Sequence, residues 1–203
     1  MKIALVSGIV AAFVLGGCVS EGPYDETRSN DDGFLSAGPL LEKEIEERIA
    51  NMPYYRGLKR LANLMRLADI GEPAIPYLIE GLKNEDSEVR AASVYALGLI
   101  DDKRVLPEIR ASLEDPDRSV QLEAAASLLG MGDWKGVPHL IRAIDDPDRY
   151  VRYKSFEALN KFTGLSFQYD FRASQEDRSA AVAKWQTWWG EKQEDDLLAG
   201  TRQ

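Results

Sequence analysis

Cysteine and histidine, the side chains that most often serve as nucleophiles, general bases or metal ligands, occur once each in this chain, as Cys18 and His139. Their scarcity excludes disulfides within the chain and Cys/His zinc sites, and it argues against a Ser-His-Asp triad. The acidic residues fall in turns and on helix faces that we expect to be solvated, and no phosphate-binding loop is present. We therefore expect a protein that is not an enzyme and that uses no metal and no cofactor.

The composition is that of a globular protein with an acidic surface. Of the 203 residues, 44% are hydrophobic and 29% are charged, which is enough apolar material for a core. Asp and Glu number 34 against 25 Lys and Arg, so the formal net charge is −9. Nucleic acid is excluded as a partner, because phosphate binding needs clustered basic side chains and no long basic run interrupts the acidic average.

The first residues have the form of an export signal. Lys2 precedes an apolar stretch over residues 3–15, which is too short to span a bilayer core of about 30 Å. The stretch ends in Leu15-Gly16-Gly17-Cys18, which resembles the lipobox of bacterial lipoproteins. The resemblance implies that residues 1–17 are a lipoprotein signal peptide and that Cys18 is lipidated. The alternative is an ordinary signal peptide with an incidental cysteine.

Residues 18–39 are predicted to be the lipidated cysteine and an acidic, flexible tether. Residues 20–39 carry five acids and one base and show no periodicity. By resemblance to bacterial sorting patterns, Val19 in place of an aspartate favours the outer membrane. We therefore expect a protein of the bacterial cell envelope, bound to the membrane through its lipid anchor and facing the periplasm.

A 31-residue repeat organises the middle of the chain. Each copy is predicted to contain a short helix with proline in its first turn, an acidic turn and a longer helix. The repeated positions are Pro76, Pro107 and Pro138; Asp86, Asp117 and Asp148; Val89, Val120 and Val151; and Leu97, Leu128 and Leu159. A helix pair that cannot enclose its own core stacks on the next pair, so the repeat predicts an all-α fold, a short α-solenoid.

These residues resemble the HEAT family, and within it the short PBS-lyase type. Ala74-Ile-Pro-Tyr-Leu-Ile79 and Val89-Arg-Ala-Ala-Ser-Val-Tyr-Ala-Leu-Gly98 carry the pattern best, and the resemblance covers three repeats over residues 73–164. It implies a structural ladder between repeats, with Asp86 pairing with Arg90 and Asp148 with Arg152. Gln121 departs from the pattern and is expected to leave the middle rung, at Asp117, uncharged.

Less regular segments flank the repeats. Residues 40–72 are predicted to form a degenerate N-terminal repeat, and residues 165–203 a capping module with a short disordered tail. In that module a short extended segment, residues 165–171, precedes a helix with Ser174 as its N-cap. Trp185, Trp188 and Trp189 lie along one side of the helix. We expect them to cover the open end of the solenoid; the alternative is an aromatic platform for a sugar.

Without a catalytic, metal or cofactor site, we expect the protein to act through a binding surface. In HEAT solenoids the second helices line the concave side, and here that side is expected to present the partner-binding candidates Tyr95, Leu122, Leu129, Tyr150 and Tyr153. The alternative is that neighbouring helices bury them. His139 takes a repeat position that unrelated residues fill in the other copies, so we expect it to face solvent.

The resulting expectation is a monomeric, non-catalytic scaffold that binds an unidentified envelope protein through its concave side. Two alternatives stay open. The family resemblance includes bilin lyases and related chaperone-like enzymes, although export and the lack of a thiol beyond Cys18 count against this reading. The tryptophan helix leaves open a module that binds envelope carbohydrate or peptidoglycan.

Overall fold

The computed structural model describes residues 24–29 and 33–200, with side chains over 33–194. Cys18 and the apolar leader lie outside the described residues. The helices are α1 (Pro39–Ala50), α2 (Gly57–Ile70), α3 (Ile75–Gly81), α4 (Ser87–Ile100), α5 (Leu106–Ala111), α6 (Arg118–Gly130), α7 (Val137–Ala143), α8 (Arg149–Thr163) and α9 (Gln175–Gly200). One-turn 3-10 segments join them: η1 (Met52–Tyr54), η2 (Glu72–Ala74), η3 (Lys103–Val105), η4 (Ser112–Glu114) and η5 (Trp134–Gly136). None of the described helices combines the length and apolar character needed to cross a membrane.

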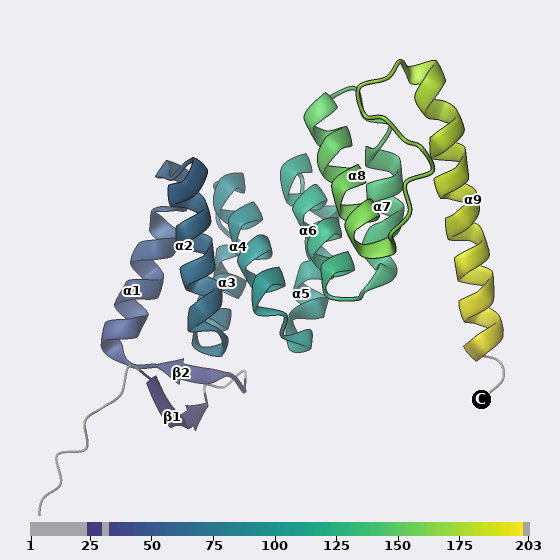
Figure 1. The fold of residues 1–203 in the computed structure, drawn as a ribbon. Helices are drawn as coiled ribbons and strands as arrows, with labels where there is room; N and C mark the ends of the chain where they lie inside the picture. The colour runs from purple at the N-terminus through teal and green to yellow at the C-terminus, as the bar shows by residue number, and fades with distance from the viewer. Residues whose placement is uncertain (1–23, 30–32, 201–203) are drawn as a thin grey trace, which may run out of the picture.

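The helices form the predicted all-α solenoid. The pairs α3/α4, α5/α6 and α7/α8 are the three repeats, and α1/α2 precedes them as an additional pair (Figure 1). The longer helices α2, α4, α6 and α8 contact one another in sequence, so they make one layer of the stack. The repeated positions Leu97, Val120, Leu128 and Leu159 are completely buried. The apolar columns of the repeat are therefore the core of the stack.

The repeated aspartates cap helices and do not pair with the arginines that follow them. The carboxylates of Asp86, Asp117 and Asp148 each accept a hydrogen bond of 2.7–2.8 Å from the backbone N–H two residues on. This N-cap geometry turns the carboxylate back to its own helix. The predicted pairs Asp86–Arg90 and Asp148–Arg152 are therefore wrong.

Other residues join the repeats. Arg90 binds both carboxylate oxygens of Asp115, in the turn of the next repeat, at 2.8 and 2.9 Å. Arg118 pairs with Asp146 in the turn after that, so the middle rung is charged despite Gln121.

The repeated position of Arg90 also closes the acidic turns. Arg90, Gln121 and Arg152 each donate to the backbone carbonyl six residues earlier, at 2.8, 2.7 and 2.6 Å. The shared role of this position is thus to hold each turn in shape, and an amide can fill it as well as a guanidinium.

Residues 33–38 belong to the folded body. Strand β2 (Leu35–Ala37) pairs antiparallel with β1 (Tyr24–Ser29). The Leu35 N–H donates to the Glu72 carboxylate at 3.3 Å, and the Phe34 ring is buried. Arg104 lies over that ring, 4.4 Å from its centroid, and donates to the Gly33 carbonyl at 3.0 Å. The predicted tether over 18–39 is wrong at its C-terminal end, because this segment finds polar and apolar partners on η2 and η3.

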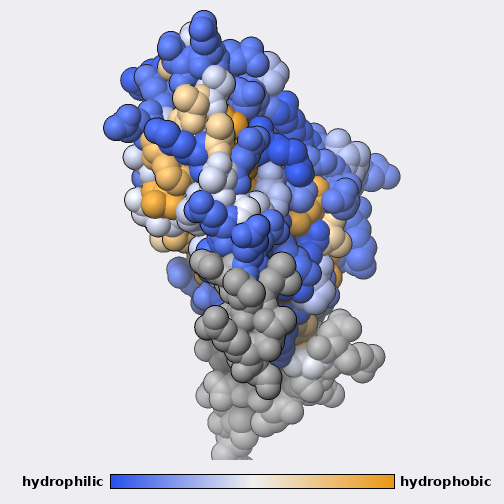
Figure 2. Space-filling view, turned by 90° about the vertical axis from the view of Figure 1, so that its right-hand side faces the viewer, coloured by the Kyte–Doolittle hydropathy of each residue, from blue (hydrophilic) through white to orange (hydrophobic). Residues whose placement is uncertain are grey.

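The last helix covers the end of the stack. Helix α9 contacts α7, and its Trp185 side chain is completely buried. Trp185 meets Phe167 edge-on at 4.9 Å and Trp188 at 5.5 Å, while Trp188 and Trp189 pack beside Trp134. The outer side of this end is largely hydrophilic (Figure 2), which is what a terminal unit of a solenoid needs for solubility. The packing is that of a cap, and it leaves Trp185 no surface for a sugar.

The segment before α9 is a loop and not the short extended segment predicted over residues 165–171. Phe167 and Gln168 have φ angles of 47° and 59°, in the left-handed region, which ends the alternation of a strand. The Tyr169 hydroxyl donates to the backbone carbonyl of Ile144 and holds the loop on the third repeat. Ser174 Oγ accepts a hydrogen bond from the Asp177 N–H at 3.2 Å, so the predicted N-cap is confirmed.

Candidate functional site

A groove runs along the layer of longer helices. It consists of a hollow of about 660 Å³ between α2, α4, α6 and α8 and an adjoining hollow of about 320 Å³ between α4, α6 and α8. We call its lining the groove face, whose apolar members include Leu61, Tyr95, Leu99, Leu122, Tyr150 and Phe162. Its charged members are Arg60, Glu88, Glu123, Lys154, Glu157 and Lys161. Since Tyr95, Leu122, Glu123 and Lys154 line both hollows, the two form one continuous surface.

Three of the five predicted partner-binding residues lie on the groove face. Tyr95 and Leu122 line both hollows, and Tyr150 lines the larger one with 65% of its surface exposed. Tyr153 is exposed but packs on the C-terminal loop, with its ring 5.1 Å from that of Phe171. Leu129 is buried, so its prediction as a surface residue is wrong. Helix α6 contacts α4, α8 and η5, which leaves less of it exposed than helical spacing alone predicts.

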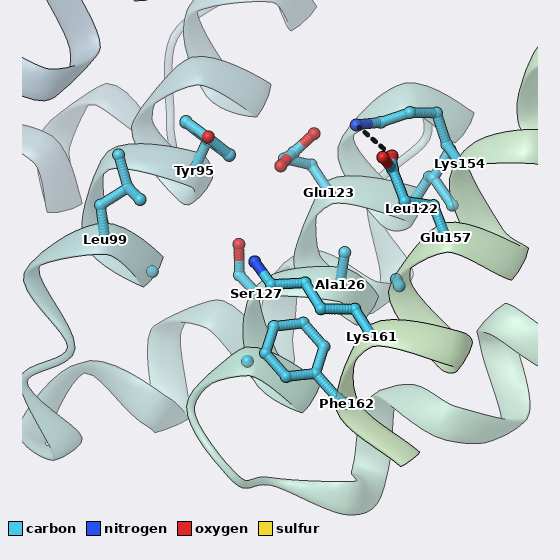
Figure 3. Close-up of a pocket in the computed structure, with 13 residues that line it drawn as sticks. Tyr95, Leu99, Leu122, Glu123, Ala126, Ser127, Lys154, Glu157, Lys161 and Phe162 are labelled. Atoms are coloured by element: carbon cyan, nitrogen blue, oxygen red, sulfur yellow. Dashed lines mark hydrogen bonds and ion pairs between the residues drawn. The ribbon is translucent and has the colours of Figure 1, made fainter. Parts of the chain in front are cut away.

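Four of the six charged residues of the groove face form ion pairs with one another, and within the described part of the chain Lys161 and Glu123 do not. Arg60 donates to Glu88 at 2.5 Å, and Lys154 lies 3.4 Å from Glu157. Within the described part of the chain, Glu123 forms no hydrogen bond and no ion pair. Figure 3 shows its carboxylate between Tyr95 of α4 and Lys154 of α8.

Burial governs the ionisation of the central carboxylate. It raises the pKa of Glu123, and the charges of Lys154 and Arg60 act in the opposite direction. Burial alone lowers the pKa of Lys154, but the charges of Glu123 and Glu157 raise it above its usual value. The groove therefore holds a lysine that stays charged and a glutamate whose charge lacks a direct partner.

Two overlapping segments of the chain, residues 58–128 and 107–182, match the family of HEAT repeats and together span more than half of the 203 residues. The chain belongs to the HEAT-repeat family. Among solved structures, the complex of CpcE and CpcF of phycocyanin lyase from Nostoc sp. PCC7120 is similar, with a TM-score of 0.48, 20% sequence identity and coverage of 71% of this chain and 99% of that chain. No curated protein matches in a sequence search.

Alignment of the repeats accounts for the place of two groove residues, Glu123 and Lys154, which the sequence did not single out. Glu123 and Lys154 occupy the same position in consecutive repeats, the sixth residue of α6 and of α8, where α4 has Ala92. Aligned side chains from neighbouring repeats stack beside one another. A column that changes from aliphatic to charged residues was therefore the available signal for Glu123.

His139 is not part of the groove face. It lines a separate hollow of about 150 Å³ with Arg118, Gln121 and Arg142. Its Nδ1 atom is buried, because α7 packs against α6 at this point, and the side chain as a whole is half-buried, so His139 faces solvent only in part. Burial and the charge of Arg142 lower its pKa. Over the described residues, no three His, Cys, Asp or Glu side chains are placed to hold a metal ion.

Proposed function

We propose that this HEAT-repeat chain is a non-catalytic scaffold of the bacterial envelope that holds a protein partner in its groove. One observation carries the proposal: the groove face exposes aliphatic and aromatic side chains although the core of the stack is already complete. Tyr150 is 65% exposed, and Leu61 and Leu99 are each 43% exposed. Apolar side chains in an open groove do not stabilise the isolated fold, and they are typical of binding surfaces.

The proposed location follows from the lipobox-like residues that end in Cys18. Six residue steps separate Cys18 from the first residue of β1, Tyr24, a span of at most about 21 Å. The paired strands β1 and β2 are held on η2 by the hydrogen bond from Leu35 to Glu72 and on η3 by the contacts of Gly33 and Phe34 with Arg104. Lipidation would therefore hold the first repeats close to the bilayer surface and keep the groove within reach of a membrane-associated partner.

Site-directed photo-cross-linking in intact cells tests the groove. A photoreactive phenylalanine analogue at Tyr150 should give a discrete protein adduct, and the same analogue at the exposed Glu80 of α3 should give none. Combining the Tyr150 analogue with Tyr95→Ala and Leu122→Ala should reduce the adduct several-fold, because both side chains line the groove. Equal adducts at the two positions, or an adduct that survives the double substitution, would contradict binding at this face.

The anchor has its own test. Cys18→Ser should move the protein from the detergent-rich to the aqueous phase in a cloud-point partition, because the acyl chains supply the membrane affinity. Recovery of this variant in the detergent-rich phase would refute lipid anchoring and leave the groove proposal standing.

A further inference from the structure

Each charged residue of the groove face other than Glu123 has an ion-pair or aromatic partner among the described residues. Arg60 pairs with Glu88 in the larger hollow, and Lys154, which lines both hollows as Glu123 does, pairs with Glu157. Lys161 lies over the ring of Phe162, 4.9 Å from its centroid. Among the described residues, only Glu123 lies at the centre of the groove without a hydrogen bond, ion pair or ring contact.

The surroundings of Glu123 make this isolation costly. Its carboxylate lies where the two hollows meet, beside Tyr95 and Leu122. The side chain is half-buried, and this burial raises its pKa, so the charged form is only partly solvated there. A partly desolvated charge without an ion pair is less stable than a solvated one, and a cation that arrives with a ligand removes that penalty. The site is thus electrostatically incomplete in the free protein.

The chemistry of the groove selects among cations. A divalent metal ion needs several oxygen ligands, whereas Glu123 is a single carboxylate near the ammonium group of Lys154. A lysine or arginine side chain needs one carboxylate for its head and an apolar path for its methylene stem. Tyr95, Leu99 and Leu122 supply such a path, and the open length of the two hollows admits a peptide segment.

Resting on the proposed function, we propose that the groove binds a partner peptide whose lysine or arginine side chain pairs with Glu123, while apolar residues on either side of it pack on Tyr95, Leu122 and Tyr150. The net charge of −9 favours the approach of a basic segment. The carboxylates of Glu88 and Glu157 already pair with Arg60 and Lys154, so they do not compete for the cation of the peptide.

Selection from a random library of 12-residue displayed peptides tests this proposal without knowledge of the partner. The native chain should enrich peptides in which Lys or Arg is flanked by apolar residues. Synthetic copies of these peptides should bind Glu123→Gln about 10- to 100-fold more weakly, the range expected for a charged hydrogen bond. Selection on Glu123→Lys should reverse the preference toward Asp or Glu. The control Glu80→Gln, at an exposed carboxylate of α3 outside the groove, should keep the preference for a basic residue.

The outcomes separate this inference from the proposed function. Peptides that lose affinity on Tyr95→Ala but show no basic preference would overturn the role of Glu123 and leave the groove as a binding face. Enriched peptides with the same preference on the native chain and on Glu123→Lys would overturn it as well. Failure to enrich any peptide would overturn peptide docking, and the photo-cross-linking experiment would then decide independently whether the groove binds a folded protein.

Discussion

Replacing Trp185 by alanine measures how far α9 stabilises the stack. The side chain is completely buried and makes edge-on contacts with Phe167 and Trp188. Truncation of a buried tryptophan lowers the free energy of unfolding by about 3–5 kcal/mol. In a chain of this size each kcal/mol lowers the melting temperature by about 2–4 °C, so the expected decrease is about 6–20 °C. Deleting residues 174–192 removes the same contacts and should lower the melting temperature at least as far.

Trp185→Phe is the matched control for this substitution. Among the described residues the buried indole Nε1 of Trp185 has no hydrogen-bond partner, and an unpaired buried donor is itself destabilising by about 1–3 kcal/mol. Phenylalanine keeps a ring beside Phe167 and removes the unpaired donor. We therefore expect Trp185→Phe to lose much less stability than Trp185→Ala.

Thermal and urea unfolding followed by circular dichroism measure both variants. Because a solenoid repeat contacts only its neighbours, loss of the cap should loosen α7 and α8 before α1 to α4. Amide hydrogen exchange resolves that order. If Trp185→Ala leaves both the melting temperature and the exchange of α7 and α8 unchanged, the reasoning that α9 is a stabilising cap is refuted.

Four further substitutions test electrostatic features of the stack by urea unfolding. Arg90→Ala leaves Asp115 unpaired between repeats and should lower the free energy of unfolding by about 3 kcal/mol, whereas Lys43→Ala, at an exposed pair, should lower it by less than about 1 kcal/mol. Hydrogen bonds from Arg66 and Arg48 lower the pKa of Glu44 to about 2, so its stabilisation should be present above pH 4.5 and be lost as the pH falls toward 2, a dependence that Glu44→Gln should remove. Glu123 has the opposite effect on the pH dependence of stability, because its pKa is raised and stability is lost as the pH rises through that pKa. Glu123→Gln should therefore raise the free energy of unfolding at pH 7, and a lower free energy of unfolding there would contradict a carboxylate without a partner.

The local features of this protein were readable from its sequence. The 31-residue columns predicted the three helix pairs, and their apolar members form the core, with Leu97, Leu128 and Leu159 completely buried. Ser174 was predicted as the N-cap of the last helix and is one. These features depend on helical periodicity and on hydrogen bonds within a few residues, so the residues that decide them lie together in the chain.

Only the tertiary structure decided which residues meet across repeats. Arg90 could not be assigned to Asp115 from spacing, because the pair lies 25 residues apart and depends on how one repeat is rotated onto the next. The burial of Leu129 and the docking of Phe34 likewise depend on neighbouring helices and turns. The isolation of Glu123 depends on the tertiary structure most of all, since a charge lacks a partner only with respect to every group around it. The sequence by itself therefore determined the repeating helices and their core, and the stacking of the repeats decided the groove and the charge at its centre.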